Sequence, residues 1–142
     1  MPPEKRERED LAALFTIISR RLIEEERPLL DAHGLTMWEY IVLSRLIRRA
    51  APSQLVLAQA IGYDKTRLIA LLDGLVQRRL VAREADPSDR RAHLVTLTEA
   101  GRELHASTQA DIRAMESRVL GTLDDVERSV LLTTLPKLAR GG

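Results

Sequence analysis

Residues 81–101 read VAREADPSDRRAHLVTLTEAG, and this stretch decides the fold of the chain. Two short runs of strand-forming residues, Val81–Ala85 and His93–Leu97, flank a segment rich in Asp, Pro, Ser and Arg. Such a pattern predicts a β-hairpin with a turn at its tip. Arg90 and Arg91 lie at or next to that tip. A helical pattern precedes the hairpin, so the sequence predicts a helix followed by a cationic hairpin. Such an arrangement can bind a DNA backbone and reach into a minor groove.

Two short helices are predicted directly before the hairpin. The first begins at Ser53 and is closed by Gly62; the second begins at Asp64, a favourable N-cap residue, and ends near Leu80. The second helix carries a leucine stripe at helical spacing, formed by Leu68, Leu71, Leu72 and Leu75. Since a turn of only about three residues separates the two helices, the sequence predicts a helix-turn-helix.

The first turn of the second helix holds Lys65, Thr66 and Arg67, and it points outward if the leucine stripe faces the core. In DNA-binding helices, side chains at this end contact base edges in the major groove. The alternative is a solvated first turn with exposed cations, but the cationic hairpin that follows favours DNA. Ser53 and Gln54 are further candidates, for phosphate contacts through backbone N–H groups.

The remaining sequence predicts four further helices. The first covers residues 7–30, with Pro28 interrupting its end, and the last contains Pro136, where the helix is expected to kink or fray. Capping boxes are predicted at Thr36 with Glu39 and at Asp124 with Glu127, and Thr98 is predicted to cap the helix after the hairpin.

Apolar stripes on the first and last helices exceed what a small DNA-binding core could cover. An exposed stripe of this size usually marks an interface. The sequence therefore predicts a homodimer joined through the two ends of the chain, by Leu11, Leu14, Phe15, Ile18, Val130, Leu131 and Leu135.

Charge is unevenly distributed along the chain, although the net charge is only +1. Between Arg45 and Arg91 there are ten Lys and Arg residues and five Asp and Glu residues, whereas the rest holds twelve basic and sixteen acidic residues. A basic segment of this kind favours a polyanionic partner. The alternative is that this uneven distribution of charge arose by chance in a protein with many charged surface residues.

Composition argues against several other classes of protein. The chain has 142 residues, no Cys and only 3 % aromatic residues, so thiol chemistry and a disulfide framework are excluded. No apolar run reaches the roughly 20 residues that span a bilayer, and the charged start of the sequence does not resemble a signal peptide. The sequence shows neither a nucleophile elbow nor a phosphate-binding glycine loop. We therefore expect a cytoplasmic non-enzyme that needs no cofactor or metal; the three histidines lack metal-ligand spacing.

The hairpin segment resembles the wing of the MarR family of winged helix-turn-helix transcription regulators, whose signature DPxDRRAxxVxLTxxG it matches almost without a gap. The resemblance extends over roughly residues 35–139. It implies a mostly α fold with a small β-hairpin wing: an N-terminal dimerisation helix (1–34), a DNA-binding region (35–101) and C-terminal dimerisation helices (102–142) in one continuous domain. In the wing, Asp89 would orient Arg91 for the minor groove, with Arg90 on a phosphate or sharing that role.

By the same resemblance, the function would be that of a sequence-specific DNA-binding regulator, a repressor released from a pseudo-palindromic operator by a small-molecule effector. The effector site is open, with Trp38 as a weak candidate that is more often core. The alternative is a winged-helix protein-interaction module without specific DNA binding. An acidic recognition helix or a wing without arginine would favour that alternative, and the sequence has neither.

Two positions in this region are unusual. Arg79 occupies the place where the family usually has Gly, and a non-Gly residue at positive φ would cost roughly 1 kcal/mol. Gly74 lies inside the second helix of the motif, where it lowers helix stability and suggests close packing against a neighbour.

Overall fold

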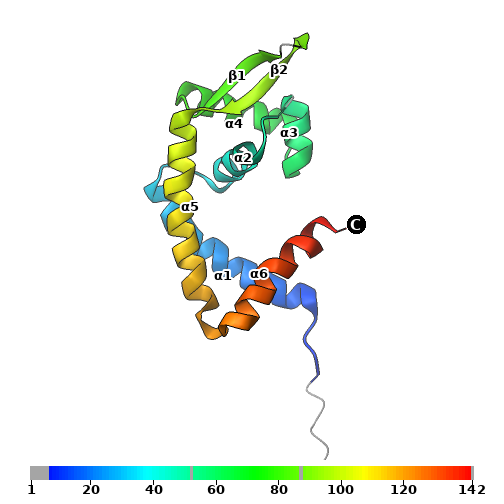
Figure 1. Cartoon of the computed structure of the whole chain (residues 1–142), viewed down its shortest axis with the longest axis vertical. Helices are drawn as coiled ribbons and strands as arrows, with labels where there is room; N and C mark the ends of the chain where they lie inside the picture. The colour runs from blue at the N-terminus through cyan, green and yellow to red at the C-terminus, as the bar shows by residue number, and fades with distance from the viewer. Residues whose placement is uncertain (1–6, 52, 87, 142) are drawn as a thin grey trace, which may run out of the picture. The chain divides into compact units, whose positions relative to one another are not determined.

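The computed structural model describes residues 7–51, 53–86 and 88–141, without the side chains of Asp86 and of residues 89–92. The elements follow one another along the described chain as in Figure 1: α1 (Leu11–Ala32), α2 (Met37–Arg48), α3 (Gln54–Ile61), α4 (Lys65–Gln77), β1 (Val81–Asp86), β2 (Asp89–Leu97), α5 (Glu99–Val119), a 3₁₀ turn η1 (Leu120–Thr122) and α6 (Asp125–Arg140). The predicted mostly α fold with a β-hairpin wing is confirmed.

The chain divides into two compact units. One spans Arg27–Asp111 and contains α2, α3, α4 and the hairpin. The other combines Met1–Glu26 with Ile112–Gly142, and so contains most of α1, the end of α5 and α6. For brevity, these are called the hairpin unit and the terminal unit.

Both predicted capping boxes are confirmed. The Thr36 hydroxyl accepts a hydrogen bond from the Glu39 amide at 3.2 Å, and Glu39 Oε1 accepts one from the Thr36 amide at 2.9 Å. At α6, Asp124 accepts from the Glu127 amide at 2.8 Å, and Glu127 accepts from the Asp124 amide at 3.1 Å. These reciprocal bonds satisfy amides that a helix cannot satisfy internally, and they explain why both helices begin where the sequence predicted.

The prediction that Pro28 interrupts the end of the first helix was wrong, whereas the kink or fray expected at Pro136 stays a prediction. Helix α1 begins at Leu11, later than predicted, and continues past Pro28 to Ala32, while α6 continues past Pro136 to Arg140. Each proline lies on an exposed part of its helix. The carbonyl that loses its backbone donor there, four residues earlier, can bond to water instead, so the helix is not forced to end.

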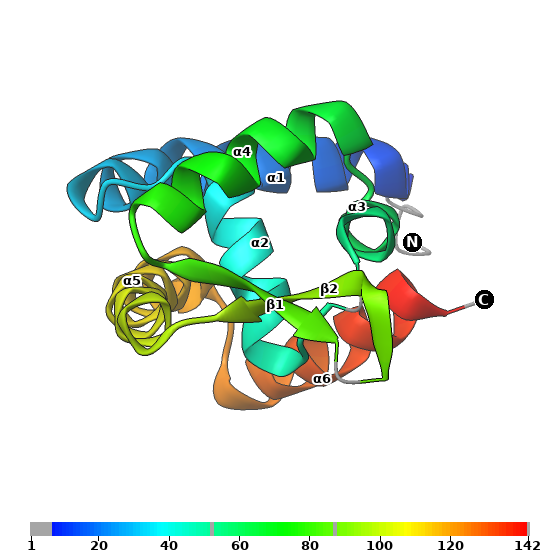
Figure 2. The ribbon, with the colours of Figure 1, turned by 90° about the horizontal axis from the view of Figure 1, so that it is seen from above.

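The core of the hairpin unit is aliphatic. Its fully buried members come from three helices and both strands: Val42, Leu43 and Leu46 of α2, Leu57 of α3, Leu68, Leu72 and Leu75 of α4, and Val81 and Val95 of the hairpin. Figure 2 shows α2 with α3, α4 and the hairpin around it. Two backbone hydrogen bonds also join Ala51 to β2. The Ala51 amide donates to the Val95 carbonyl at 3.0 Å, and the Val95 amide donates to the Ala51 carbonyl at 2.8 Å.

The two predicted runs pair antiparallel, from Val81 opposite Leu97 to Ala85 opposite His93. The register then shifts between Ala85 and Asp86, and Asp86 lies opposite Asp89. The backbone of Arg90 and Arg91 therefore belongs to β2 and not to the connecting turn.

The packing expected at Gly74 is absent, because a Cβ there would meet no atom within 4 Å among the described residues. The close approach occurs instead at Gly101, where an added Cβ would lie 2.1 Å from the Leu80 carbonyl oxygen. In sequence, a glycine inside a helix looks the same in both cases, and only the fold distinguishes them.

Arg79 has a φ of +59°, so the left-handed residue suspected at this position is confirmed. The turn it forms lies between α4 and β1 and is closed by the Leu80 amide, which bonds to the Leu75 carbonyl at 3.0 Å. The Thr98 hydroxyl donates to the Arg79 carbonyl at 2.7 Å and accepts from the Gly101 amide at 3.0 Å. One threonine therefore fixes this turn and caps α5, as predicted.

Replacing Arg79 with Gly should stabilise the protein by up to about 1 kcal/mol, because glycine adopts positive φ without the steric penalty of a Cβ. Arg79→Ala is the matched control: it also removes the side chain but keeps the Cβ. Chemical denaturation of both variants measures the difference. If Arg79→Gly were no more stable than Arg79→Ala, the left-handed turn would carry no strain.

Candidate nucleic-acid interface

The two helices of the motif are joined by a tight, well-bonded turn. Gly62 closes α3 in the left-handed conformation, with φ 67° and ψ 40°, and the Tyr63 amide bonds to the Ala58 carbonyl at 2.9 Å. Asp64 then caps α4 by accepting from the Arg67 amide at 2.9 Å. The predicted helix boundaries at Ser53, Gly62 and Asp64 are all confirmed.

The start of α4 presents a cationic end to solvent. Lys65, Thr66 and Arg67 are exposed, whereas Leu68, one residue later, is fully buried. Because the buried leucines anchor α4 along one side, its first turn projects away from the core. The structure thus brings the three residues together at an exposed helix N-terminus, where amides and cations both attract anions.

Strand β2 carries the predicted wing residues. The backbone of Asp89, Arg90 and Arg91 lies at its start, next to the connecting turn, and their side chains are outside the described part of the structure. Thus the proposed pairing of Asp89 with Arg91 stays a prediction.

Ser53 and Gln54 have other bonds than those predicted. The Ser53 hydroxyl caps α3 by accepting from the Val56 amide at 3.1 Å. The Gln54 side-chain oxygen accepts from Arg83 Nη2 at 3.0 Å, and the same nitrogen donates to Asp73 Oδ1 at 2.6 Å. Their suggested phosphate contacts remain a prediction.

Sequence reasoning missed Arg83, which joins β1 to α3 and α4. A signal was present: side chains alternate along a strand, so Arg83 shares a face with buried Val81. A charged residue on the inward face of a strand needs a polar partner. What the sequence could not supply was the identity of that partner, because Asp73 and Gln54 lie on two other elements.

A family model described as the MarR family matches residues 33–92. A MarR-family transcriptional regulator from Rhodococcus sp. RHA1 is 26 % identical with a TM-score of 0.78, over 95 % of this chain and 100 % of that chain. The chain is similar to MarR-family transcriptional regulators in the residues that the family model matches and in its fold. The wing and the helix-turn-helix described above are part of that similarity.

Three further solved structures that resemble this chain concern DNA or a small molecule. CouR from Rhodococcus jostii RHA1, bound to p-coumaroyl-CoA, is 29 % identical, with a TM-score of 0.78 over 94 % of both chains. CouR has also been solved as a transcriptional repressor bound to a 23-mer DNA duplex, with a TM-score of 0.77. BpsR from Bordetella bronchiseptica, whose DNA binding is regulated by 6-hydroxynicotinic acid, is 26 % identical, with a TM-score of 0.77 over 94 % of this chain and 96 % of that chain.

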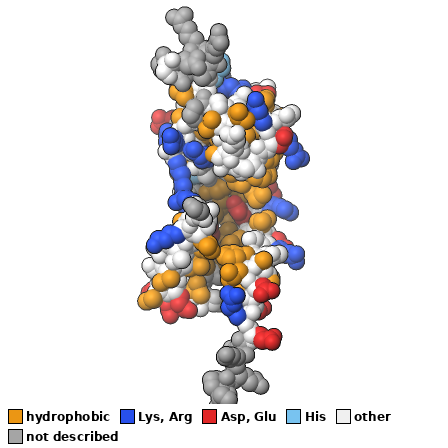
Figure 3. All heavy atoms as spheres, turned by 90° about the vertical axis from the view of Figure 1, so that its right-hand side faces the viewer, with side chains coloured by type: hydrophobic (Ala, Val, Ile, Leu, Met, Phe, Trp, Pro, Cys, Tyr) orange, Lys and Arg blue, Asp and Glu red, His pale blue; other side chains and the backbone are white. Residues whose placement is uncertain are grey.

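The terminal unit of this chain exposes many apolar side chains. Those exposed by more than a third include Leu11, Phe15, Ile17, Ile18, Ile23, Val126, Val130, Leu132 and Leu138, whereas Leu14, Leu131 and Leu135 are half-buried. Figure 3 shows apolar side chains, in orange, gathered on the surface of this unit. An apolar groove of about 490 Å³ also runs along α6, lined by Leu123, Val126, Glu127, Val130, Leu131, Thr134, Leu135 and Leu138.

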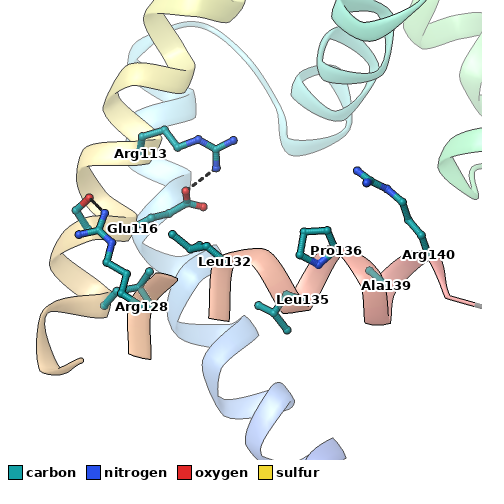
Figure 4. A pocket seen from close by; sticks show the side chains of 10 residues that line it. Arg113, Glu116, Arg128, Leu132, Leu135, Pro136, Ala139 and Arg140 are labelled. Carbon is teal, nitrogen blue, oxygen red and sulfur yellow. Dashed lines mark hydrogen bonds and ion pairs between the residues drawn. The ribbon is translucent and has the colours of Figure 1, made fainter. Parts of the chain in front are cut away.

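A second, more polar cavity of about 600 Å³ lies between α5 and α6 in the same unit (Figure 4). Arg113, Arg128 and Arg140 line it, together with Glu116 and apolar residues of α6. Arg113 donates to Glu116 at 2.8 Å. Burial raises the pKa of nearby Glu26, and the negative charge of Glu116 raises that pKa further.

Trp38 is half-buried and packs on Tyr63, with ring centroids 4.4 Å apart. Both rings belong to the hairpin unit, so Trp38 links α2 to the turn before α4. This contact supports its alternative role as a core residue.

Three observations concern other kinds of function. The three histidines do not gather: His33 bonds to Asp111 at 2.7 Å, buried His105 bonds to Ser44 at 3.0 Å, and His93 is exposed. No group of three or more potential metal ligands occurs among the described residues. Within the same residues, no helix is long and apolar enough to cross a membrane.

Proposed function

We propose that this protein is a MarR-family regulator, a homodimeric repressor that binds a pseudo-palindromic operator. Lys65, Thr66 and Arg67 would read bases in the major groove, and Arg91 would enter the flanking minor groove. The observation that carries the proposal is the exposed, cationic first turn of α4 in one unit with the hairpin that bears Arg90 and Arg91. The DNA-bound structure of CouR, 29 % identical, supports it.

In this proposal, residues 35–101 bind DNA, and residues 1–34 and 102–142 form the dimer. Two-fold symmetry would place two copies of α4 roughly 34 Å apart, one turn of DNA, so the operator would be an inverted repeat. The exposed apolar surface of the terminal unit supports this assignment.

We further propose that a small molecule lowers the affinity for DNA, as the ligands of CouR and BpsR suggest. A cavity of about 600 Å³ in the terminal unit is large enough for an effector. Since Trp38 is engaged with Tyr63, it is a weaker candidate for effector contact than the residues of that cavity.

A selection of genomic fragments tests the proposed function. The purified protein should retain a small set of fragments at moderate salt, and these should share an inverted repeat. Retention of all fragments alike would indicate non-specific binding, and retention of none would favour the protein-interaction module.

Single substitutions should separate base reading from groove binding. Arg67→Ala or Lys65→Ala should change the preferred base at one position of each half-site, at a cost of roughly 1–3 kcal/mol. Arg91→Ala should weaken operator binding and reduce the slope of log affinity against log salt, by up to about 1 for each phosphate charge that is no longer neutralised. Fluorescence anisotropy with systematically altered duplexes measures both effects.

Arg118→Ala is the control for these variants, because Arg118 is exposed but lies in the terminal unit. It should leave both the preference and the slope unchanged. If Arg67→Ala and Lys65→Ala weakened every sequence equally, those side chains would contact phosphates and not bases.

A further inference from the structure

Arg83 connects three elements of the hairpin unit through one guanidinium nitrogen. Arg83 Nη2 donates to Asp73 Oδ1 at 2.6 Å and to Gln54 Oε1 at 3.0 Å, so β1 is tied to α4 and to α3 at the same point. The Arg83 side chain is 29 % exposed, and that of Asp73 is 56 % exposed. An exposed ion pair of this kind adds only about 0–1 kcal/mol to stability, so it points to a role other than holding the fold together.

Asp73 lies on the face of α4 that is proposed to meet DNA. It follows Thr66 by seven residues, which places the two side chains two turns apart on the same side of the helix. Both are exposed, whereas Leu68, Leu72 and Leu75 hold the opposite face in the core. A free carboxylate at this place would repel the phosphates of a duplex, and the guanidinium of Arg83 neutralises it.

Arg83 itself belongs to the firmly held part of the hairpin. It pairs across the strands with Val95, which is fully buried and also bonded through its backbone to Ala51. The wing arginines lie beyond this point, toward the tip of the hairpin. The contact with Asp73 is therefore placed where it can fix the direction of the free end of the wing relative to α4.

We propose that Arg83 is a positioning residue, which holds the wing at a fixed angle to α4 so that both reach DNA at once. The proposal rests on the DNA binding proposed above. Two linked contacts bind more tightly than separate ones only if their geometry allows both to form together. Ordering a loose wing at the moment of binding would cost affinity, and the bridge to Asp73 and Gln54 removes that cost.

The sign of the effect of Asp73→Ala on affinity is the main test. Removing a negative charge near DNA should, by electrostatics alone, strengthen binding. If Asp73 acts by holding Arg83, Asp73→Ala should instead weaken operator binding, by about tenfold, and Arg83→Ala should do the same. Asp73→Asn keeps an oxygen acceptor for Arg83 and should restore part of the loss.

Glu84→Ala is the matched control, because Glu84 is an exposed acid on β1, next to Arg83. It should leave affinity unchanged or raise it slightly. If Asp73→Ala behaved like Glu84→Ala, or if Arg83→Ala alone weakened binding and lowered the salt slope, Arg83 would be a phosphate contact and the proposal would be overturned.

Combining Arg83→Ala with Arg91→Ala provides a second readout. Without Arg83, the wing should already place Arg91 poorly in the minor groove. The loss of affinity from Arg91→Ala should therefore be smaller in the Arg83→Ala background than in the wild type. Fully additive losses would contradict a positioning role.

A measurement without DNA separates this proposal from the proposed function. The sequence has no Cys, so spin labels can be attached at His93→Cys on β2 and at Ala70→Cys on α4, both exposed. The distribution of distances between the labels should be narrow in the otherwise unchanged chain, broader with Arg83→Ala or Asp73→Ala, and narrow with Glu84→Ala. Equal widths in all four would overturn the positioning role even if the protein binds its operator, whereas a broadening would support that role even if no operator were found.

Discussion

Gly101→Ala is expected to destabilise the protein by about 3 kcal/mol or more. The new Cβ would lie 2.1 Å from the Leu80 carbonyl oxygen and 3.0 Å from Leu97 Cδ1. That carbonyl accepts a hydrogen bond from the Thr98 amide at 3.1 Å, so it cannot turn away without breaking the junction between the hairpin and α5. Thermal and chemical denaturation measure the loss of stability.

Gly74→Ala is the matched control, because it also places one methyl group on a helical glycine. It should stabilise the protein by about 0.5–1 kcal/mol, since alanine has the higher helix propensity and its Cβ meets no described atom within 4 Å. Effects of the same sign in both variants would contradict the packing at the junction of Leu80 and α5.

Val130→Glu combined with Leu138→Glu is expected to convert the proposed dimer to monomers and to abolish specific DNA binding. The two side chains are 56 % and 64 % exposed and line the apolar groove along α6, so the charges should not disturb the core of a single chain. Burying a few hundred Å² of this surface at roughly 25 cal/mol per Å² would supply several kcal/mol before the costs of association. Two buried carboxylates would reverse that gain.

Ser129→Glu combined with Thr133→Glu is the matched control. Both residues are exposed on α6 and do not line the groove, so the pair adds the same charge outside the groove. These chains should remain dimeric in light scattering and keep their affinity for the operator.

The wild-type melting temperature should rise with protein concentration, because association stabilises the folded chain. A well-folded wild-type monomer at micromolar concentration, bound to the operator as one subunit per site, would refute the dimer.

Local chemistry determined most of the element boundaries. Ser53, Asp64 and Asp124 accept hydrogen bonds from amides of the following helix, and Gly62 adopts the left-handed turn that ends α3, so these signals could be read from the sequence. Each acts within about four residues, a range at which the partner is fixed by the chain itself. The wing was also predictable, because strand-forming runs on both sides of a turn have few other ways to pair.

The tertiary structure alone decided which residues meet across elements. Arg83 was visible as a charge on an inward strand face, but its bonds to Asp73 and Gln54 depend on how α3, α4 and β1 pack. Likewise, Gly74 and Gly101 look equivalent in the sequence, yet only Gly101 lies against a carbonyl. The reason is physical: caps and turns are set by neighbours along the chain, whereas the partner of a side chain and the space around a glycine are set by elements that folding brings together.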